Sequence, residues 1–420
     1  MGWKKTKIGE FLFERKGLLD PNDRALFSFK KIEKIDFSEG KIFLSDYSPT
    51  KTKQIIVKKR DFVFSGLNIE KGAVAINDFD QELVVSANYS TCEVDYLKVD
   101  QNFLKFLIKS QFFKNLLKEN LKKDYGFTRP KHLMNLEIYL PSLEEQKQVA
   151  EKLKLNEEKQ KNLQLQVNQQ KTNLKNLRKQ ILQDAIEGKL TKEWREKNPD
   201  IEPASELLKK IKKEKEKLIS EKKIKKEKPL PEINKSEIPF ELPESWVWTR
   251  LGEVMSFIYG SSLTKDKTKN NGKYPVYGSN GITGYYNEFL TDKKSIIVGR
   301  KGSAGALNVS YNPSWTTDVA YYVEEREGID FAFMFFLLKS LKLEDLGKGI
   351  KPGLNRNEAY FLIISLPPLP EQLAIVSKLQ TLMQKLDEVE KQIEKNLTFS
   401  KQLSKVILAE AFNQNNLEKK

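Results

Sequence analysis

The chain has 420 residues, enough for two or three domains with proper hydrophobic cores. Its 73 lysines and arginines outnumber its 58 aspartates and glutamates, so the formal net charge is +15 and a polyanionic partner is favoured. Cys92 is the single cysteine, and the longest apolar run, residues 331–338, is far shorter than the ~20 residues of a membrane helix. No signal peptide precedes Trp3, so we expect a soluble, cytoplasmic protein without disulfides.

Residues 1–141 are predicted to form a first globular domain of mixed helix and strand. Strand-like runs alternate with turns rich in glycine, asparagine and aspartate; the runs are Lys53–Lys58, Asp61–Ser65, Leu83–Val85 and Cys92–Val99. An amphipathic helix is expected at about 103–121, and an Ile-Tyr-Leu strand ends at Pro141.

A long helical spacer is predicted over residues 142–188. Ser142 and Glu145 match a capping box at its start, and Gly188 is placed to end the helix. Apolar residues step by three and four between them, which is the heptad pattern of a helix that packs on another helix. The predicted packing positions are Val149, Leu153, Leu163, Val167, Leu174, Leu177 and Ile181.

Residues 189–245 are predicted to be a linker. Its segment 209–228 holds 11 lysines against 4 glutamates, and such a run is typical of a solvated helix. Four prolines follow before the second domain: Pro229, Pro231, Pro239 and Pro243.

The rest of the chain repeats the first part, which predicts a second domain at 246–366 and a second spacer at 367–413. Residues 138–153 (IYLPSLEEQKQVAEKL) recur as residues 364–379 (ISLPPLPEQLAIVSKL). The distance along the chain between the two copies is far longer than the repeat length of a solenoid protein. The packing positions of the second helix are Ile375, Leu379, Leu382, Leu386, Val389, Ile393, Leu403 and Ile407.

Two matching helices in one chain can bury their apolar stripes against each other. We therefore expect an α+β protein whose two α/β domains are separated by an antiparallel coiled coil, with rods roughly 65 Å long that set the spacing between the domains. Packing of each helix on its own domain is the alternative.

Catalytic and metal-site chemistry is not indicated. His132 is the single histidine, so a zinc site or a Ser–His–Asp constellation has too few members, and no metal or cofactor is expected. The run GRKGSAG at 299–305 lacks the spacing of a phosphate-binding loop. The run Asn312-Pro313-Ser314-Trp315 resembles a motif of DNA amino-methyltransferases, but its place between two strand-like runs favours an ordinary turn.

The remaining polar loops suit contact with nucleic acid. Arginine and lysine pair with phosphate or guanine, and asparagine pairs with adenine. Glycines beside such side chains let the backbone approach a partner closely. The candidate DNA-binding residues of the second domain are Tyr274, Tyr277, Ser279, Asn280, Arg300, Lys301 and Ser303. Those of the first domain are Arg60, Ser65, Asn68 and Lys71.

Several segments together resemble the specificity subunits of type I restriction–modification systems. They are IPFELPESWVWTRLGEV (238–254), YPVYGSNGITGYYNEF (274–289), IIVGRKGSAG (296–305), EPASELLKKIKKEKEKL (202–218) and the Leu-Pro-x-Leu-x-Glu-Gln helix starts. The resemblance implies two target-recognition domains that each read one part of a split DNA sequence, and paired helices that dock methyltransferase subunits. It implies no catalysis in this chain, because methyl transfer and ATP-driven cleavage belong to the partner subunits.

Both copies share a frame but differ in the middle, at about 15–90 and 258–315. Such a scaffold suits an asymmetric target, because a symmetric target would need only a homodimer of one copy. Two other classes stay open. One is a DNA-binding scaffold for a different defence or modification enzyme, and the other is a coiled-coil interaction protein that does not bind DNA.

Overall fold

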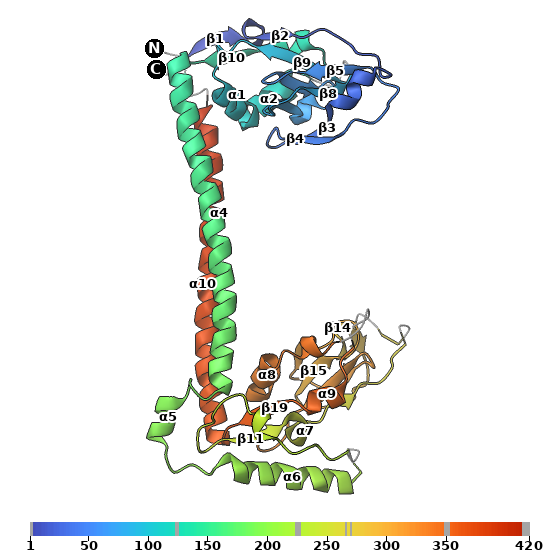
Figure 1. The fold of residues 1–420 in the computed structure, drawn as a ribbon, viewed down its shortest axis with the longest axis vertical. Helices are drawn as coiled ribbons and strands as arrows, with labels where there is room; N and C mark the ends of the chain where they lie inside the picture. The colour runs from blue at the N-terminus through green and yellow to red at the C-terminus, as the bar shows by residue number, and fades with distance from the viewer. Residues whose placement is uncertain are drawn as a thin grey trace. The chain divides into compact units, whose positions relative to one another are not determined.

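The computed structural model describes residues 3–121, 126–222, 228–264, 267–268, 271–347 and 353–413. The chain divides into unit 1, residues 1–168 with 393–420, and unit 2, residues 169–392. Each unit holds one globular domain and one part of both long helices, α4 (Leu143–Ile186) and α10 (Leu369–Ala411) (Figure 1). Within the described residues, no helix combines the length and the apolar character needed to cross a membrane.

Unit 1 contains two four-stranded sheets and a two-stranded pair. The first sheet has the order β2-β9-β6-β7, and all its neighbours are antiparallel. The second has the order β4-β3-β8-β5, with β3 and β8 parallel. The strands are β1 (Lys4–Lys7), β2 (Leu12–Glu14), β3 (Lys30–Ile35), β4 (Ile42–Asp46), β5 (Gln54–Val57), β6 (Phe62–Ser65), β7 (Val74–Ile76), β8 (Leu83–Ser86), β9 (Tyr89–Val94) and β10 (Glu137–Leu140), which pairs with β1.

Ser110 divides the region predicted as one helix at 103–121 into two. The helices of this domain are α1 (Gln101–Lys109), α2 (Gln111–Asn120) and α3 (Pro130–Met134), with short 3-10 turns at Ile8–Glu10, Arg24–Ser28 and Ile69–Lys71. Ser110 is extended, and its hydroxyl accepts a hydrogen bond from Phe113 N at 3.1 Å. The prediction of one helix was wrong because this serine caps a new helix start.

The predicted strand Cys92–Val99 was also too long at its end. Strand β9 stops at Val94 because Asp95 begins a turn, in which its carbonyl accepts from Lys98 N and Val99 N. The other strand-like runs of the first domain coincide with β5, β6 and β8 to within two residues.

Strand β6 shows how the layers of unit 1 are built. Its side chains alternate between two faces, as in any strand. Phe62 and Phe64 are fully buried in the cluster that includes Phe103 of α1, and Val63 lies in the cluster of the second sheet. Full burial of a phenylalanine contributes about 1.5–3 kcal/mol. Unit 1 therefore has a helix layer, a central sheet and an outer sheet.

Unit 2 repeats this plan. The sheet β12-β18-β15-β16 matches β2-β9-β6-β7, and β14-β13-β17 matches β4-β3-β8, including a parallel pair in the same place. Ile296 and Val298 of β15 join the helix-side cluster, while Ile297 packs with Tyr277 of the outer sheet. The strands are β11 (Val247–Arg250), β12 (Ile258–Tyr259), β13 (Tyr274–Gly278), β14 (Gly281–Tyr286), β15 (Ser295–Gly299), β16 (Leu307–Ser310), β17 (Trp315–Thr316), β18 (Ala320–Glu324) and β19 (Ile363–Leu366), which pairs with β11.

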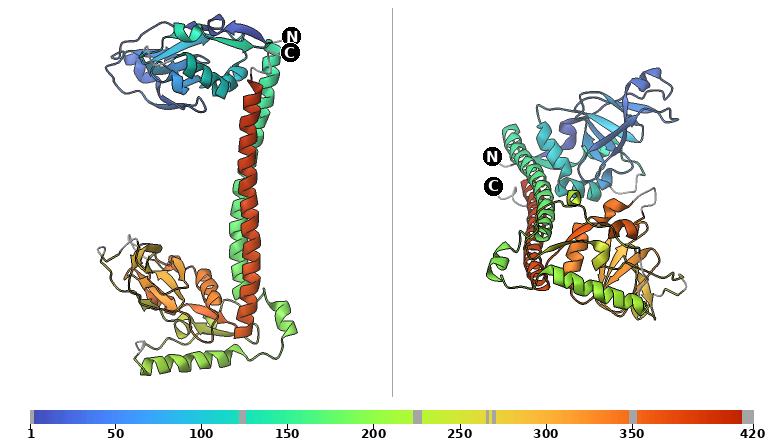
Figure 2. Two further views of the ribbon diagram at one scale, coloured as in Figure 1. Left: turned by 180° about the vertical axis from the view of Figure 1, so that it is seen from behind. Right: turned by 60° about the horizontal axis from the view of Figure 1, so that its bottom comes forward.

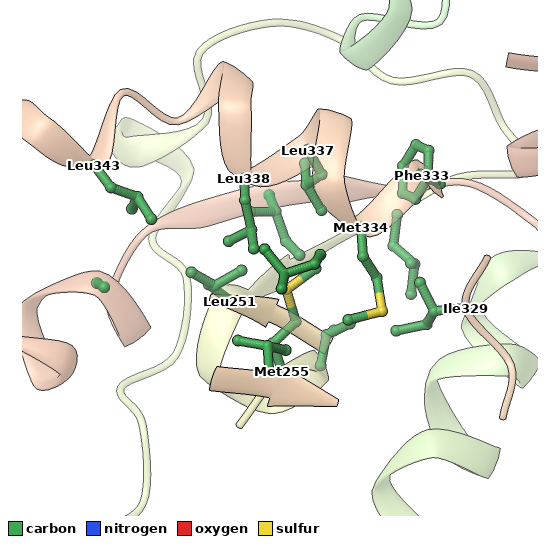
Figure 3. Close-up of a cluster of buried hydrophobic side chains, with 14 of the residues drawn as sticks. Leu251, Met255, Ile329, Phe333, Met334, Leu337, Leu338 and Leu343 are labelled. Carbon is green, nitrogen blue, oxygen red and sulfur yellow. The ribbon is translucent and has the colours of Figure 1, made fainter. Parts of the chain in front are cut away.

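The core of unit 2 forms around α8 (Phe331–Ser340). Phe333, Met334, Leu337 and Leu338 of this helix pack on Leu251 and Met255, as Figure 3 shows. The other short helices are α5 (Lys192–Lys197), α6 (Ala204–Ser220), α7 (Leu251–Val254) and α9 (Arg356–Tyr360), with 3-10 turns at Lys235–Glu237 and Leu343–Leu346.

The described part of the lysine-rich segment lies on unit 2. Helix α6, the green helix at the bottom of the left view in Figure 2, contacts α7, and its Leu207 and Ile211 are buried in the core of the unit. The Lys215 ammonium donates to Gly252 O at 2.6 Å. Residues 223–227 of the predicted solvated helix lie outside the described residues.

The two long helices run antiparallel within each unit. In unit 1, Asn156 Nδ2 donates to Ser404 Oγ at 2.9 Å, and Gln160 Nε2 donates to Ser400 Oγ at 2.6 Å. In unit 2, Arg178 Nη2 lies 2.7 Å from Asp387 Oδ1 and 2.9 Å from Glu390 Oε2. Leu182 of α4 and Leu379 of α10 share the apolar cluster of unit 2.

Three predicted packing positions were wrong. Leu177, Val389 and Leu403 are 46%, 48% and 47% exposed, and the next residue in each case takes the inner place: Arg178, Glu390 and Ser404. The prediction assumed one apolar residue every 3.5 positions, but a straight α-helix has 3.6 residues per turn. Over about five heptads this difference adds up to roughly one residue, so the residue that faces the partner helix shifts to the next position. The other predicted packing positions are buried or half-buried.

Candidate nucleic-acid interface

In unit 2 the β13–β14 turn lies against the loop that follows β15. A Cβ atom on Gly299 would lie 2.6 Å from Ser279 O and 2.0 Å from Ser303 O, so only glycine fits there. A Cβ on Gly302 would lie 3.9 Å from Ser279 Oγ. The fold therefore brings together the predicted residues Ser279, Asn280, Arg300, Lys301 and Ser303.

These side chains differ in how they are held. Asn280 and Lys301 are exposed, while Ser279, Arg300 and Ser303 are half-buried. Arg300 Nη1 donates to Asp318 O at 2.8 Å, so its guanidinium is oriented by a backbone carbonyl. The arrangement presents amide, hydroxyl and cationic groups from two adjacent loops, which are the groups that contact phosphates and base edges.

Two residues that the sequence analysis missed adjoin this loop. The Arg300 guanidinium lies 5.0 Å from the centre of the Tyr259 ring, and the Arg356 guanidinium lies 4.8 Å from the same ring centre. Tyr259 is at the end of β12, and Arg356 begins α9. The run GKGIKPGLNR at 347–356, with glycines between cations, is the sequence signal that could have pointed to Arg356.

Of the two predicted tyrosines, one was wrong as a DNA contact. Tyr277 is 7% exposed, and its hydroxyl donates to Val309 O at 3.2 Å, because β13 turns this side chain toward the central sheet. Tyr274 is half-buried, and its ring meets Phe289 edge-on at 5.1 Å. The Asn312–Trp315 run bends at Asn312 after β16 and enters β17 at Trp315, so it connects two strands, as the turn interpretation predicts.

Unit 1 has the equivalent pair of loops. The loop after β6 contains the predicted residues Asn68 and Lys71, and the Lys71 ammonium donates to Asn68 Oδ1 at 3.1 Å. A Cβ on Gly72 at the end of this loop would lie 2.7 Å from Phe37 O of the β3–β4 turn. As in unit 2, a hairpin turn of the outer sheet packs on a glycine of this loop.

Of the other two predicted residues of unit 1, Ser65 was wrong because it is buried, whereas Arg60 is exposed and stays a prediction. Ser65 is 3% exposed, because it is the last residue of the buried strand β6. Arg60 lies before β6 and the Asn68–Lys71 loop lies after it, so the strand separates them. The Arg60 guanidinium stacks at 4.2 Å over the Tyr96 ring, and Arg60 has a left-handed backbone with φ of 68°.

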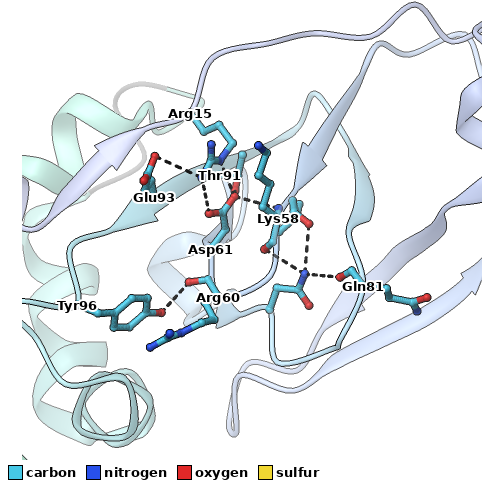
Figure 4. A network of polar contacts seen from close by, with 10 residues as sticks. Arg15, Lys58, Arg60, Asp61, Gln81, Thr91, Glu93 and Tyr96 are labelled. Carbon is cyan, nitrogen blue, oxygen red and sulfur yellow. Dashed lines mark hydrogen bonds and ion pairs between the residues drawn. The ribbon is translucent and has the colours of Figure 1, made fainter.

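A polar network beside Arg60 has a structural explanation (Figure 4). Asp61 is buried, and its carboxylate accepts from Arg15 Nε at 2.7 Å and Arg15 Nη2 at 2.9 Å. The hydrogen bond to Asp61 raises the pKa of Arg15, and burial raises the pKa of Tyr96 to about 12. The described residues contain no cluster of three or more histidine, cysteine or acidic side chains placed to hold a metal ion.

The β3–β4 hairpin of unit 1 was also missed. The ammonium groups of Lys34 and Lys41 lie 4.7 Å and 5.4 Å from the centre of the Phe43 ring, which is 37% exposed. Ile32 and Ile35 are three residues apart, so the sequence lacks the strict alternation that predicts a strand, and β3 takes up the extra residue as an irregularity between Ile32 and Lys34.

The second domain and part of α10 match a known family. Residues 243–398 match the family described as "Type I restriction modification DNA specificity domain". The structure is similar to that of the HsdS subunit from Thermoanaerobacter tengcongensis, with a TM-score of 0.60 and 18% identity, over 98% of this chain and 96% of that chain. At that identity the similarity concerns the fold alone.

Among the similar curated proteins are specificity subunits of type I restriction enzymes. The EcoAI type I restriction enzyme specificity subunit of Escherichia coli is 40% identical over 131 residues, 29% of this chain, and the match spans only 22% of that subunit. The EcoDI specificity subunit of the same organism is 26% identical over 333 residues, 73% of this chain and 70% of its own length. Residues 243–398 therefore match the family of type I restriction modification DNA specificity domains, and the chain is similar to type I restriction enzyme specificity subunits.

Proposed function

We propose that this chain recognises DNA within a type I restriction–modification complex, and that each unit reads one half of an asymmetric two-part site. One observation carries the proposal. In both units a hairpin turn of the outer sheet packs against the loop that follows a central strand, β6 in unit 1 and β15 in unit 2, but the two loops carry different side chains. Unit 2 presents Arg300 and Lys301 there, and unit 1 presents Asn68 and Lys71. One scaffold with two sets of contacts suits two unlike half-sites.

The chemistry of these loops supports direct contact with a duplex. Exposed Asn280 can pair with adenine, and Arg300 or Lys301 can contact guanine or phosphate. The net charge of +15 favours association with the polyanion. A network held by carboxylates, such as Arg15 with Asp61, is neutralised within the protein and does not take part.

We further propose that two methyltransferase subunits dock on α4 and α10, and that ATP-dependent restriction subunits join the same complex. In this arrangement the chain is not catalytic, because the partner subunits catalyse the methyl transfer. The complex works in the cytoplasm. The helices also carry exposed apolar side chains, such as Leu155, Leu165 and Phe399, and these fit a surface that other subunits can cover.

The test is a methylation assay on a duplex library with randomised half-sites and spacers. The chain purified with the modification subunit from the same genome should direct methylation to one asymmetric two-part sequence, and the chain alone should methylate nothing. Methylation of a symmetric site, or methylation by rigorously pure chain, contradicts the proposal. A chain that assembles without any sequence preference contradicts it as well.

A further inference from the structure

We propose that unit 1 carries a docking site for a basic amphipathic helix of a partner subunit. The site, here named the helix-docking site, is formed by Glu10, Phe13 and Leu97. The inference goes beyond the proposed function, because it concerns a protein partner rather than DNA. It rests on the internal repeat, since α6 covers the equivalent surface of unit 2.

Helix α6 covers two turns of unit 2. At α7, the Lys212 ammonium lies 3.5 Å from the Glu253 carboxylate. At the turn before α8, a Cβ atom on Gly328 would lie 3.1 Å from Leu207 Cδ1 and 3.4 Å from Ile211 Cγ1. Two apolar side chains and one lysine of a single helix are therefore docked on these two turns.

Unit 1 contains both turns. The 3-10 turn Ile8–Glu10 repeats α7, and Glu10 stands where unit 2 has Glu253. Residues 95–99, between β9 and α1, repeat the turn before α8. The Lys98 ammonium donates to Glu10 O at 2.9 Å, so the two turns lie side by side.

The surface at these turns is apolar and open. Leu97, in the turn at residues 95–99, is 87% exposed, and Phe13 is 48% exposed. Phe13 adjoins the same turn, because Asp95 N donates to Phe11 O at 2.8 Å. Large apolar side chains that are exposed at one place are typical of a surface that a partner covers.

The position of Phe13 adjoins α6 in unit 2. Its repeat equivalent, Ser256, lines a cavity of about 400 Å³ together with Glu214 and Leu218 of α6. A helix docked in the same way on unit 1 would meet the phenyl ring of Phe13 at that place. Burial of this ring and of Leu97 would supply the apolar contacts that stabilise docking.

Glu10 supplies the matching charge. Its side chain is exposed and accepts a hydrogen bond from Lys7 N at 3.0 Å. The neighbouring Lys98 pairs with Asp95 at 3.6 Å, and among the described residues no cation forms an ion pair with the Glu10 carboxylate. A lysine of a docked helix can therefore pair with Glu10, as happens at the equivalent glutamate of unit 2. Because the pair is exposed, it directs the helix more than it adds affinity.

The occupant is a helix of another protein rather than α6. Leu207 and Ile211 of α6 are 7% and 1% exposed, because they are buried in the core of unit 2. Neither this α6 nor that of a second copy can leave its unit without exposing them. The partner helix therefore has the pattern of α6, with two aliphatic residues four positions apart and a lysine directly after the second.

The experiment titrates the full chain into a fluorescein-labelled peptide with the sequence of residues 202–220 and follows its anisotropy. The chain's own α6 occupies unit 2, so we expect saturable binding of the peptide to unit 1. Leu97→Asp should weaken binding by about tenfold, because a buried apolar contact is lost. Glu10→Lys should weaken binding by about threefold, and a peptide with Lys212→Glu should restore it.

Leu67→Asp is the matched control. Leu67 is 49% exposed, but it follows β6 and lies at the other end of the β6–β9 pair from residues 95–99, so its replacement should leave peptide binding unchanged. Thermal melting of each variant checks that unit 1 stays folded. Loss of binding in a folded Leu97→Asp variant, but not in the control, supports the inference.

Three results overturn the inference. They are the absence of saturable binding, binding that Leu97→Asp leaves unchanged, and binding that is lost only with Glu253→Lys, because the peptide would then have displaced α6 from unit 2. Peptide binding does not depend on the DNA sequence. A chain that binds the peptide but directs methylation to no particular sequence keeps the helix-docking site and loses the proposed function.

Discussion

The side chain of Gln372 accepts a hydrogen bond from Asp330 N at 2.9 Å, which ties the start of α10 to the start of α8. Its Nε2 donates to Pro367 O at 3.0 Å. In unit 1, Gln146 accepts from Asp100 N at 2.7 Å and donates to Pro141 O at 3.0 Å. The glutamine of the repeated Leu-Pro-x-Leu-x-Glu-Gln motif therefore has a structural role in both copies.

Replacement of this glutamine should destabilise its unit. Gln372→Leu leaves a buried backbone N–H and a carbonyl without their partner, at a cost of about 1–3 kcal/mol. Urea unfolding followed by tryptophan fluorescence reports on unit 2, which holds Trp194, Trp246, Trp248 and Trp315. Gln384→Leu on the exposed face of the same helix is the control. Equal midpoints for the two variants would contradict the assigned role.

Loss of Arg195 should be more costly than loss of Arg178. Glu371 is fully buried and accepts from Arg195 Nη1 at 2.5 Å and Trp246 Nε1 at 2.7 Å. Arg195→Ala leaves this carboxylate without its cation and should lower the free energy of unfolding by about 3–5 kcal/mol. Arg178→Ala removes an ion pair with two partly exposed acids and should cost less than about 1 kcal/mol. Denaturant titrations of both variants give the comparison, and the reverse order would refute it.

Cys92 should react with thiol reagents only after unit 1 opens. The side chain is fully buried, and burial raises the pKa of its thiol to about 12. The folded thiol stays protonated at pH 9, whereas the unfolded thiol begins to ionise there, so unit 1 loses stability as the pH rises above about 9. Pulsed labelling across the urea transition at pH 8 and pH 10 measures this. Fast labelling of the native protein would contradict it.

Asn280 and Lys301 should affect DNA binding in different ways. Asn280→Ala should lower affinity for sites with one particular base pair, by about 1–3 kcal/mol, if it pairs with adenine. Lys301→Ala should lower affinity equally on all sequences and reduce the salt slope by about one unit. Binding of each variant to a randomised half-site library separates these outcomes. Buried Tyr277, as Tyr277→Phe, is the control and should leave the sequence preference unchanged.

The repeat and the heptad pattern predicted most of the architecture. The same motifs at one offset predicted two like domains, and the chain places matching sheets in both units. The outer-sheet hairpin of unit 1 was missed because its apolar residues Ile32 and Ile35 do not alternate with period two, and because its turn holds one glycine, Gly40, whereas YPVYGSNGITGYY holds three.

The residues of the site were harder to predict than the fold. Sequence placed Ser65 and Tyr277 in polar loops, but burial depends on which face of a strand meets the neighbouring sheet. Arg356 is 97 residues away from Tyr259 along the chain, and only the folded structure brings them together. The spacing between half-sites, which the helices are predicted to set, stays a prediction.

The polar side chains between the long helices of unit 1 bear on the choice of partner helix. Asn156 and Gln160 bond to Ser404 and Ser400, whereas their repeat equivalents on α10 are Leu382 and Leu386. If two copies of α10 paired antiparallel, leucines would face those serines and the amides would be missing. If two copies of α4 paired, Gln160 would face Leu174. Because the two long helices have similar sequences, α4 could in principle pair with a second α4, or α10 with a second α10. The matched hydrogen bonds in unit 1 favour instead the pairing of α4 with α10 within a single chain.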